Sequence, residues 1–283
     1  MSRINDLVRK NRGLLRDPAA WGHAARAAGL RARNIAGPPQ DLVIAPSRLL
    51  AGQHKAMTTY FSAVLQTICF AYNLSFQKVI RGYPETRTDV VLHFTSNFQD
   101  EPRASGEYLL VKILRDPRDV VLSGYHYHLW SDESWVNTRW NDQPSLKERL
   151  QAMDKDEGIH AEIERVGRMV AATYSDWGRS DPDVLVIRYE DLIGPSRHDA
   201  YDRIFRHWQF HGPAHDFAVN TMAGFEFERR TGRQIGSTGT GVHLRSGKSG
   251  GWQAELNDSH KDAIKAHFGQ ELIRFGYETD LDW

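Results

Sequence analysis

Short, continuous runs of apolar residues alternate with longer stretches of helical periodicity, and this alternation constrains the fold more than any other feature. The expected strands are rich in Val, Ile and Leu and lie at 47–52, 90–94, 108–114 and 184–189. Apolar side chains recur at steps of three or four in the expected helices, which lie at 57–73, 158–179 and 258–275. Continuous β-branched runs are typical of strands buried on both faces of a parallel sheet. The pattern predicts an α/β fold, with a mostly parallel sheet of about five strands flanked by helices.

The first 37 residues differ from the rest in charge. They contain eight Arg or Lys and two Asp, so their net charge is +6, whereas the whole chain has 36 residues of each sign. Gly37-Pro38-Pro39 then reads as a linker, so we predict a basic N-terminal arm at 1–37 and one domain at 38–283. Three interpretations of the arm remain open. They are helices packed on the domain, a helix lying on a membrane surface, and an organelle transit peptide.

Composition and hydropathy exclude several kinds of binding, cross-link and membrane insertion. The balanced net charge gives no bulk attraction to nucleic acid, so any anion site must be local. Cys69 is the one cysteine, and it can form neither an internal disulfide nor a cysteine-rich metal site. No apolar stretch approaches the length of a membrane span, and no secretory signal is visible at the N-terminus. We therefore expect a cytoplasmic protein.

The first segment that carries chemistry joins an expected strand to an expected helix. Lys55 follows the strand 47–52, and Thr58 and Thr59 stand at the start of the helix 57–73. Free backbone N–H groups, the helix dipole, a lysine and two hydroxyls make a cradle for an anion. A surface lysine beside a threonine cap is the alternative. A Walker loop is excluded because its Gly-Lys-Ser/Thr run is absent.

The second segment follows the strand 108–114. Arg115 stands at the carboxyl end of this strand, where α/β sheets bind ligands, and Ser123 comes roughly two turns into the next helix. An arginine fork and a hydroxyl can hold a phosphate. The alternative is a structural salt bridge with Asp116, which better explains the neighbouring Arg118 and Asp119.

The third segment, 243–256, is rich in glycine and basic residues. Arg245, Lys248 and the backbone near Gly247 can form a basic nest for an anion. Taken alone, this loop is better interpreted as a solvated, mobile connection.

Together these segments resemble the PAPS-dependent sulfotransferases of the cytosolic and bacterial type, where PAPS is 3′-phosphoadenylyl sulfate. Lys55–Tyr60 is similar to that family's Lys-Ser-Gly-Thr-Thr-Trp loop for the 5′-phosphosulfate. Arg115–Val120 with Ser123 resembles its 3′-phosphate motif, and Tyr189–Leu192 matches its Tyr-Glu-Asp-Leu. Arg245–Trp252 resembles the closing Arg-Lys-Gly-x-x-Gly-Asp-Trp loop. The resemblance runs from about residue 47 to residue 283 and implies a P-loop-like fold and sulfuryl transfer.

The resemblance also implies a role for each matching residue. The 5′-phosphosulfate would be held by Lys55, Thr58 and Thr59. The 3′-phosphate would be held by Arg115, Ser123, Arg245 and the Gly247 backbone. Aromatic rings at the adenosine would come from Tyr60, Tyr189, and Phe225 or Phe227. Lys55 would also act in catalysis, and His93 would be the base, with Asp100, Glu101 and His54 in reserve.

Several residues depart from the family pattern. Met57 replaces a loop glycine, so a positive φ at this position would strain the backbone. Ser246 replaces a phosphate-binding lysine, for which Lys248 is the available substitute. Gly251 replaces an Asp, and Val91 replaces a lysine near the predicted base.

The predicted reaction is in-line transfer of a sulfuryl group from PAPS to a hydroxyl or amine, with no metal required. The acceptor, a small molecule, a carbohydrate or a lipid, is not identified by the sequence. Two rival functions remain, a P-loop kinase and a non-catalytic nucleotide-binding protein of the same fold. A peripheral membrane contact through 1–37 also stays open.

Overall fold

The structure is a computed structural model that describes residues 17–37, 39, 42, 46–84, 86–96, 108–174, 182–237 and 247–283. It divides into two compact units, each described here by itself. The sheet unit comprises 1–114, 176–239 and 244–247, and the helical unit comprises 115–175, 240–243 and 248–283.

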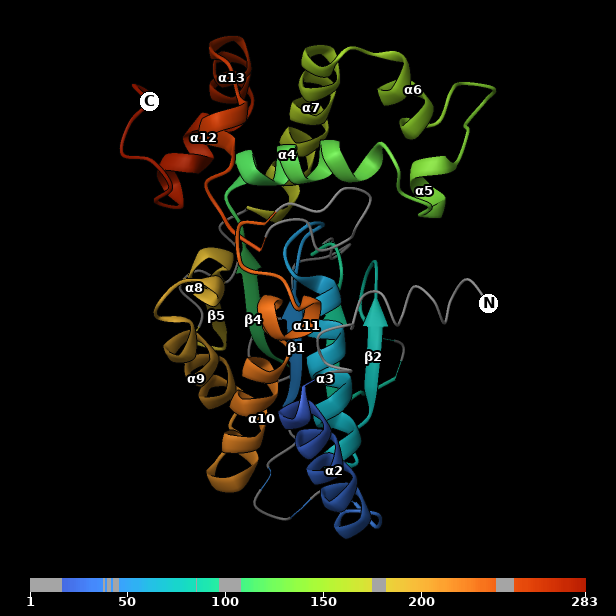
Figure 1. The fold of residues 1–283 in the computed structure, drawn as a ribbon, viewed down its shortest axis with the longest axis vertical. Helices are drawn as coiled ribbons and strands as arrows, with labels where there is room; N and C mark the ends of the chain where they lie inside the picture. Colours follow the sequence, from blue (N-terminus) through green and yellow to red (C-terminus); the bar gives the residue numbers. More distant parts are fainter. Residues whose placement is uncertain are drawn as a thin grey trace. The chain divides into compact units, whose positions relative to one another are not determined.

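Five parallel strands form the centre of the sheet unit (Figure 1). In chain order they are β1 (Ser47–Ala51), β2 (Phe76–Val79), β3 (Val90–His93), β4 (Tyr108–Leu114) and β5 (Val184–Arg188). Their order across the sheet is β2-β3-β1-β4-β5, so β1 lies in the middle. Leu50 pairs in register with Leu92 of β3 and Val111 of β4, which aligns the carboxyl ends of the three central strands.

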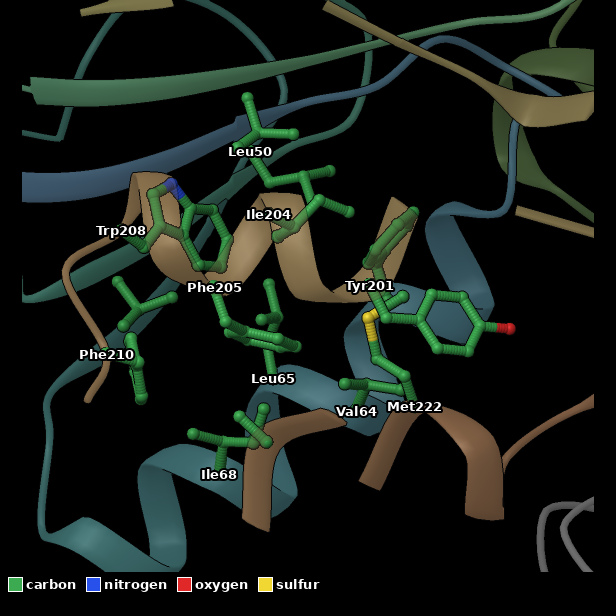
Figure 2. Packing of buried hydrophobic residues seen from close by; sticks show 14 of the residues in the cluster. Leu50, Val64, Leu65, Ile68, Tyr201, Ile204, Phe205, Trp208, Phe210 and Met222 are labelled. Atoms are coloured by element: carbon green, nitrogen blue, oxygen red, sulfur yellow. The ribbon is translucent and has the colours of Figure 1, made fainter. Parts of the chain in front are cut away.

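One face of this sheet supports the main hydrophobic core. Strand residues alternate between faces, so Leu50 belongs to the main core cluster, whereas Leu49 and Ala51 belong to a smaller cluster. The helices that contribute to the main cluster include α2 (Pro18–Arg33), α3 (Thr58–Tyr72), α9 (Arg197–His207) and α10 (Gly212–Gly224). Figure 2 shows Leu50 of β1, Leu65 of α3 and Phe205 of α9 within this cluster. Two short helices complete the described part of the unit, α8 (Tyr189–Ile193) and α11 (Phe227–Thr231).

Helix α2, the described helix of the predicted basic arm, packs against α3 and α10. The His23 ring stacks on Phe217 at 4.7 Å between centroids, and its Nε2 lies 2.8 Å from the Thr221 hydroxyl. The Asn34 amide donates to the Ala71 carbonyl at 3.2 Å. These contacts are those of an arm packed on its domain, although Trp21 on the same helix is 61% exposed.

The helical unit is built on helices with well-defined ends. Its helices are α4 (Pro117–His128), α5 (Ser134–Asn137), α6 (Leu146–Ala152), α7 (Lys155–Thr173), α12 (Trp252–Glu255) and α13 (Asp258–Arg274). Capping boxes at Ser145, Asp154 and Asn257 satisfy the first N–H groups of α6, α7 and α13. The predicted apolar stripe of α7 is buried at Ile159 and Ile163. These two side chains fix the face of α7 that the unit buries.

The predicted α/β class and the parallel sheet of about five strands are confirmed. The four strands located in the sequence agree with the structure to within one residue at each end. Two details differ. The edge strand β2 was not located, because its residues are mostly half-exposed and form no apolar run. The short helix α5, whose Val136 is buried, was not located in the sequence either.

Candidate functional site

The turn between β1 and α3 places the first predicted site residues at the carboxyl edge of the sheet. The Gly52 N–H donates to the His93 carbonyl at 2.9 Å, and the Gly52 carbonyl accepts from the Ser96 hydroxyl at 2.6 Å. The chain then turns through Lys55 and Met57, whose φ angles are +68° and +63°. Left-handed backbone is unfavourable for residues with a Cβ, so the loop holds a strained conformation at both positions. The glycine that the resembling loop carries is replaced here by a methionine in the conformation that a glycine would favour.

Helix α3 begins at Thr58 without a side-chain cap. Its N-cap is Met57, whose side chain makes no capping hydrogen bond, and its first turn contains no acidic residue. Lys55 precedes this helix start and Thr59 belongs to its first turn; both are half-buried. Uncapped N–H groups and the positive end of the helix dipole favour an anion at this position. The predicted loop residues Lys55, Thr58 and Thr59 therefore lie together at a helix start suited to a phosphosulfate.

His93 is the last residue of β3, and its side chain is fully buried. Its Nε2 donates to the Gly82 carbonyl at 3.1 Å, and its Nδ1 accepts from the Thr95 N–H at 3.4 Å. Burial lowers the pKa of His93 to about 4, although the bond to Gly82 opposes this effect. The ring is thus neutral at pH 7, and both of its nitrogens have backbone partners. These contacts are typical of a histidine packed in the core and satisfied by backbone groups, and the base role of His93 remains a prediction.

The predicted adenine-stacking residue Tyr60 lies in the main core cluster. It is 5% exposed, and its hydroxyl donates to the Met222 carbonyl at 2.7 Å. Tyr189, the first residue of α8, is also buried. Phe225 stands at the carboxyl end of α10 and packs against the core. All three rings belong to the sheet unit; their contact with a nucleoside remains a prediction.

Phe227 and Gly247 meet within the sheet unit. A Cβ on Gly247 would lie 2.6 Å from Cγ of the Phe227 ring, and Gly247 has a φ of +68°. The Arg233 guanidinium lies 5.0 Å from the centroid of the same ring. Glycine is therefore required at 247 for two reasons, the close approach of the ring and the left-handed backbone.

Arg115 and Ser123 belong to the helical unit. The Arg115 backbone N–H donates to the Tyr174 hydroxyl at 3.2 Å, and the Arg115 carbonyl accepts from that hydroxyl. Asp116 caps α4 by accepting from the Arg118 N–H at 2.9 Å, and Pro117 occupies the first helical turn. Ser123 lies on the same helix and is half-buried. The start of α4 therefore has the predicted cap and proline, and it positions Arg115 directly before the helix.

Arg118 and Asp119 have structural roles, as the salt-bridge alternative predicts. The Arg118 guanidinium pairs with Asp116 at 2.8 Å and with Glu278. The Asp119 carboxylate accepts from the backbone N–H groups of Gly250 at 2.6 Å and of Trp252 at 3.2 Å. Asp119 thus holds the carboxyl end of the closing loop on α4.

Several predicted residues lie outside the described residues: Arg245, Ser246, Asp100 and Glu101. His54 is described and lies half-buried in the turn beside Lys55. Lys248, the available substitute for the missing lysine, is exposed. Within the described part of the chain, no cluster of three or more His, Cys, Asp or Glu could hold a metal ion. No helix among the described residues is both long and apolar enough to span a bilayer.

Sequence reasoning missed the long-range partners of Arg118. Glu278 and the ring of Trp283 contact its guanidinium from more than a hundred residues away. No local spacing indicates such a contact. The available signal is the charge itself, because an arginine predicted to be at a buried helix start needs a carboxylate partner.

Among the solved structures that share the fold are two that contain PAP. The crystal structure of mouse sulfotransferase SULT7A1 complexed with PAP has a TM-score of 0.53 and 13% identity, covering 86% of this chain and 88% of that chain. The structure of retinol dehydratase in complex with androsterone and inactive cofactor PAP has a TM-score of 0.51 and 14% identity, covering 88% and 85%. At such identities the likeness shows the fold alone, and it confirms the predicted fold class.

No curated protein sequence matches this chain significantly. The family described as "Sulfotransferase domain" matches residues 104–276. This match spans 173 of the 283 residues, more than half of the chain, and includes Arg115, Ser123 and Gly247. The predicted resemblance is therefore confirmed, and the chain belongs to the sulfotransferase family.

Proposed function

We propose that this sulfotransferase takes the sulfuryl group from PAPS and transfers it to a hydroxyl or amine of a small-molecule, carbohydrate or lipid acceptor. The observation that carries the proposal is the start of α3, where Lys55, Thr58 and Thr59 follow the carboxyl end of β1 and the N-cap Met57 supplies no capping side-chain bond. Such a helix start accommodates the 5′-phosphosulfate. The PAP present in the two similar structures supports this choice of donor.

In the proposed step, the acceptor oxygen or nitrogen forms a bond to sulfur as the bond from sulfur to the 5′-phosphate oxygen breaks. The leaving group is PAP, which is adenosine 3′,5′-bisphosphate, and negative charge grows on its 5′-phosphate. Lys55 and the N–H groups at the start of α3 would stabilise that charge, so their contribution is larger in the transition state than in the ground state. The residues supply positioning and charge stabilisation, as in phosphoryl transfer.

The 3′-phosphate is proposed to bind Arg115, Ser123, Arg245 and the Gly247 backbone. Arginine forks and backbone N–H groups suit a dianionic phosphate. The left-handed φ of Gly247 supports this assignment, because left-handed residues occur in the backbone nests that bind anions. The rings of Tyr60, Tyr189, Phe225 and Phe227 are proposed for the adenosine.

His93 remains the proposed base that removes the acceptor proton. A neutral imidazole can accept a proton, and its Nδ1 accepts from the Thr95 N–H at the long distance of 3.4 Å. The ring must give up this contact to receive the acceptor proton. His54, in the turn beside Lys55, is the second candidate and is tested in parallel. A cytoplasmic location is proposed with this function.

The deciding experiment is transfer of labelled sulfate from PAPS into small-molecule, sugar and lipid acceptors, with mass spectrometry of the product. We expect transfer by the wild-type chain and a loss of turnover in Lys55→Ala that greatly exceeds the loss of PAP affinity. Lys78→Ala, a change at an exposed lysine of the edge strand β2, is the matched control.

The outcomes separate the proposed function from its two rivals. PAP binding without transfer to any acceptor would contradict the proposal in favour of a non-catalytic nucleotide-binding protein. Phosphoryl transfer that requires magnesium would favour the kinase. A Lys55→Ala variant with normal turnover and a raised KM alone would remove Lys55 from catalysis.

A further inference from the structure

Arg118 is a buried cation enclosed by aromatic rings in the helical unit. Its side chain is 2% exposed. Its guanidinium lies 3.8 Å from the ring centroid of Trp252 and 4.6 Å from that of Trp283, and the two indoles meet edge to face at 5.5 Å. Cation–π contacts are strongest where water is excluded, so this arrangement couples the three side chains.

The segment after α13 brings Trp283 to this place. Helix α13 ends in a Schellman motif, in which Tyr277 N–H donates to the Leu272 carbonyl at 2.8 Å and Gly276 N–H to the Ile273 carbonyl at 2.9 Å. The motif directs the chain so that Glu278 pairs with Arg118. The chain then continues to Trp283, whose ring also lies 5.2 Å from Lys265 Nζ.

The other side of the cluster is the carboxyl end of the closing loop. Trp252 follows Gly250 and Gly251 directly, and Asp119 fixes the N–H groups of Gly250 and Trp252. Asp119 and Arg118 are adjacent on α4. Asp119 therefore holds the backbone of this loop end, and the neighbouring Arg118 holds its Trp252 indole.

We propose that Trp283 and Glu278 are positioning residues for nucleotide binding, acting through Arg118 and Trp252 on the closing loop. The inference rests on the proposed function, in which this loop contributes to the site of the 3′-phosphate. Removal of the Trp283 ring takes from Arg118 one of its two cation–π partners and from Trp252 its edge-to-face neighbour. Asp119 still holds the backbone of the loop end, but the Trp252 side chain is less firmly oriented, and the 3′-phosphate loses part of its binding energy.

The test compares two nucleotides by calorimetry, PAP and adenosine 5′-phosphosulfate, of which only PAP carries the 3′-phosphate. We expect Trp283→Ala to weaken PAP binding roughly 5–30-fold, the effect of removing one buried cation–π partner and its packing. Adenosine 5′-phosphosulfate should change far less. Trp283→Phe should restore most of the PAP affinity, and Glu278→Gln should show a smaller loss of the same kind. Trp21→Ala, at an exposed tryptophan of α2, is the matched control and should bind both nucleotides as the wild type does.

Thermal unfolding of each variant separates positioning from general destabilisation. Equal losses for both nucleotides, or unchanged PAP affinity in Trp283→Ala, would overturn the inference. If Trp283→Ala does not fold, Trp283→Phe and Glu278→Gln decide by the same comparison. A wild-type chain that binds neither nucleotide would contradict the proposed function itself, which distinguishes the two failures.

Discussion

His93 should make the fold sensitive to acid, and replacing it should remove that sensitivity. In the unfolded chain its pKa is the ordinary 6.5, whereas burial lowers the folded value to about 4. Below pH 6.5 the unfolded chain therefore binds a proton that the native chain does not. Stability from this group falls as the pH decreases from 6.5 to about 4 and is unaffected above that window.

The magnitude follows from the two pKa values. Relative to pH 7.5, the free energy of unfolding should fall by ~2 kcal/mol at pH 5 and ~3 kcal/mol at pH 4 because of His93 alone. His23, His207 and His260 have pKa values lowered by burial as well, so they add to the acid sensitivity of the wild type. Comparison of His93→Gln with the wild type isolates the single residue. The Gln amide can still donate to the Gly82 carbonyl, so the variant should lose only ~1 kcal/mol at pH 7.5.

Urea unfolding at pH 7.5, 6.0 and 5.0 measures this difference. The stability of His93→Gln should converge on that of the wild type, or exceed it, at pH 5.0. If the free energies of unfolding of the two proteins differ by the same amount at all three pH values, the reasoning is refuted. Turnover of the same variant tests the base. A loss of ~10²–10⁴-fold with PAP still bound supports His93 as the base, whereas near-normal turnover assigns His93 to the core and directs the test to His54.

Two further variants test the site architecture. Gly247→Ala should destabilise the protein more than Gly250→Ala, because both positions have positive φ but only the Cβ at 247 meets the Phe227 ring. Chemical unfolding should show a loss of stability of ~1–2 kcal/mol for Gly250→Ala and a larger loss for Gly247→Ala. An equal loss in the two variants would contradict the contact. Arg118→Met should lower the free energy of unfolding by ~3–5 kcal/mol, because it removes the guanidinium that neutralises the buried Asp116 carboxylate. Arg139→Met, which breaks an exposed pair with Glu148, should change little, and similar melting temperatures for the two Arg variants would contradict the buried role.

The strands that hold the site were predictable because their local amino-acid composition indicates that they are buried. Val90–His93 and Tyr108–Leu114 are continuous apolar runs, and both are almost wholly buried. β2 was missed because an edge strand needs no such run. The order of the strands follows from no local pattern, since β1 lies between β3 and β4 through pairing of distant segments.

The candidate site was predictable where a motif is continuous in the chain. Asp116 as a cap and Pro117 in the first turn follow from elementary helix chemistry, and both are found in the structure. The contact of Phe227 with Gly247 and the enclosure of Arg118 by two tryptophans were not predictable. Each depends on side chains that converge only in the folded unit.

The two main departures from the family pattern have different physical consequences. Met57 keeps the left-handed backbone that a glycine would supply, and its side chain packs against the main core cluster, which offsets part of the strain. The N–H groups at the start of α3 depend on backbone conformation alone, so this substitution preserves what the phosphosulfate would contact. Ser246 stands where the family places a lysine, and no backbone adjustment replaces a missing positive charge. We therefore expect the departures to affect the 3′-phosphate more than the 5′-phosphosulfate, with Lys248, two residues after Ser246, the available substitute for the missing lysine.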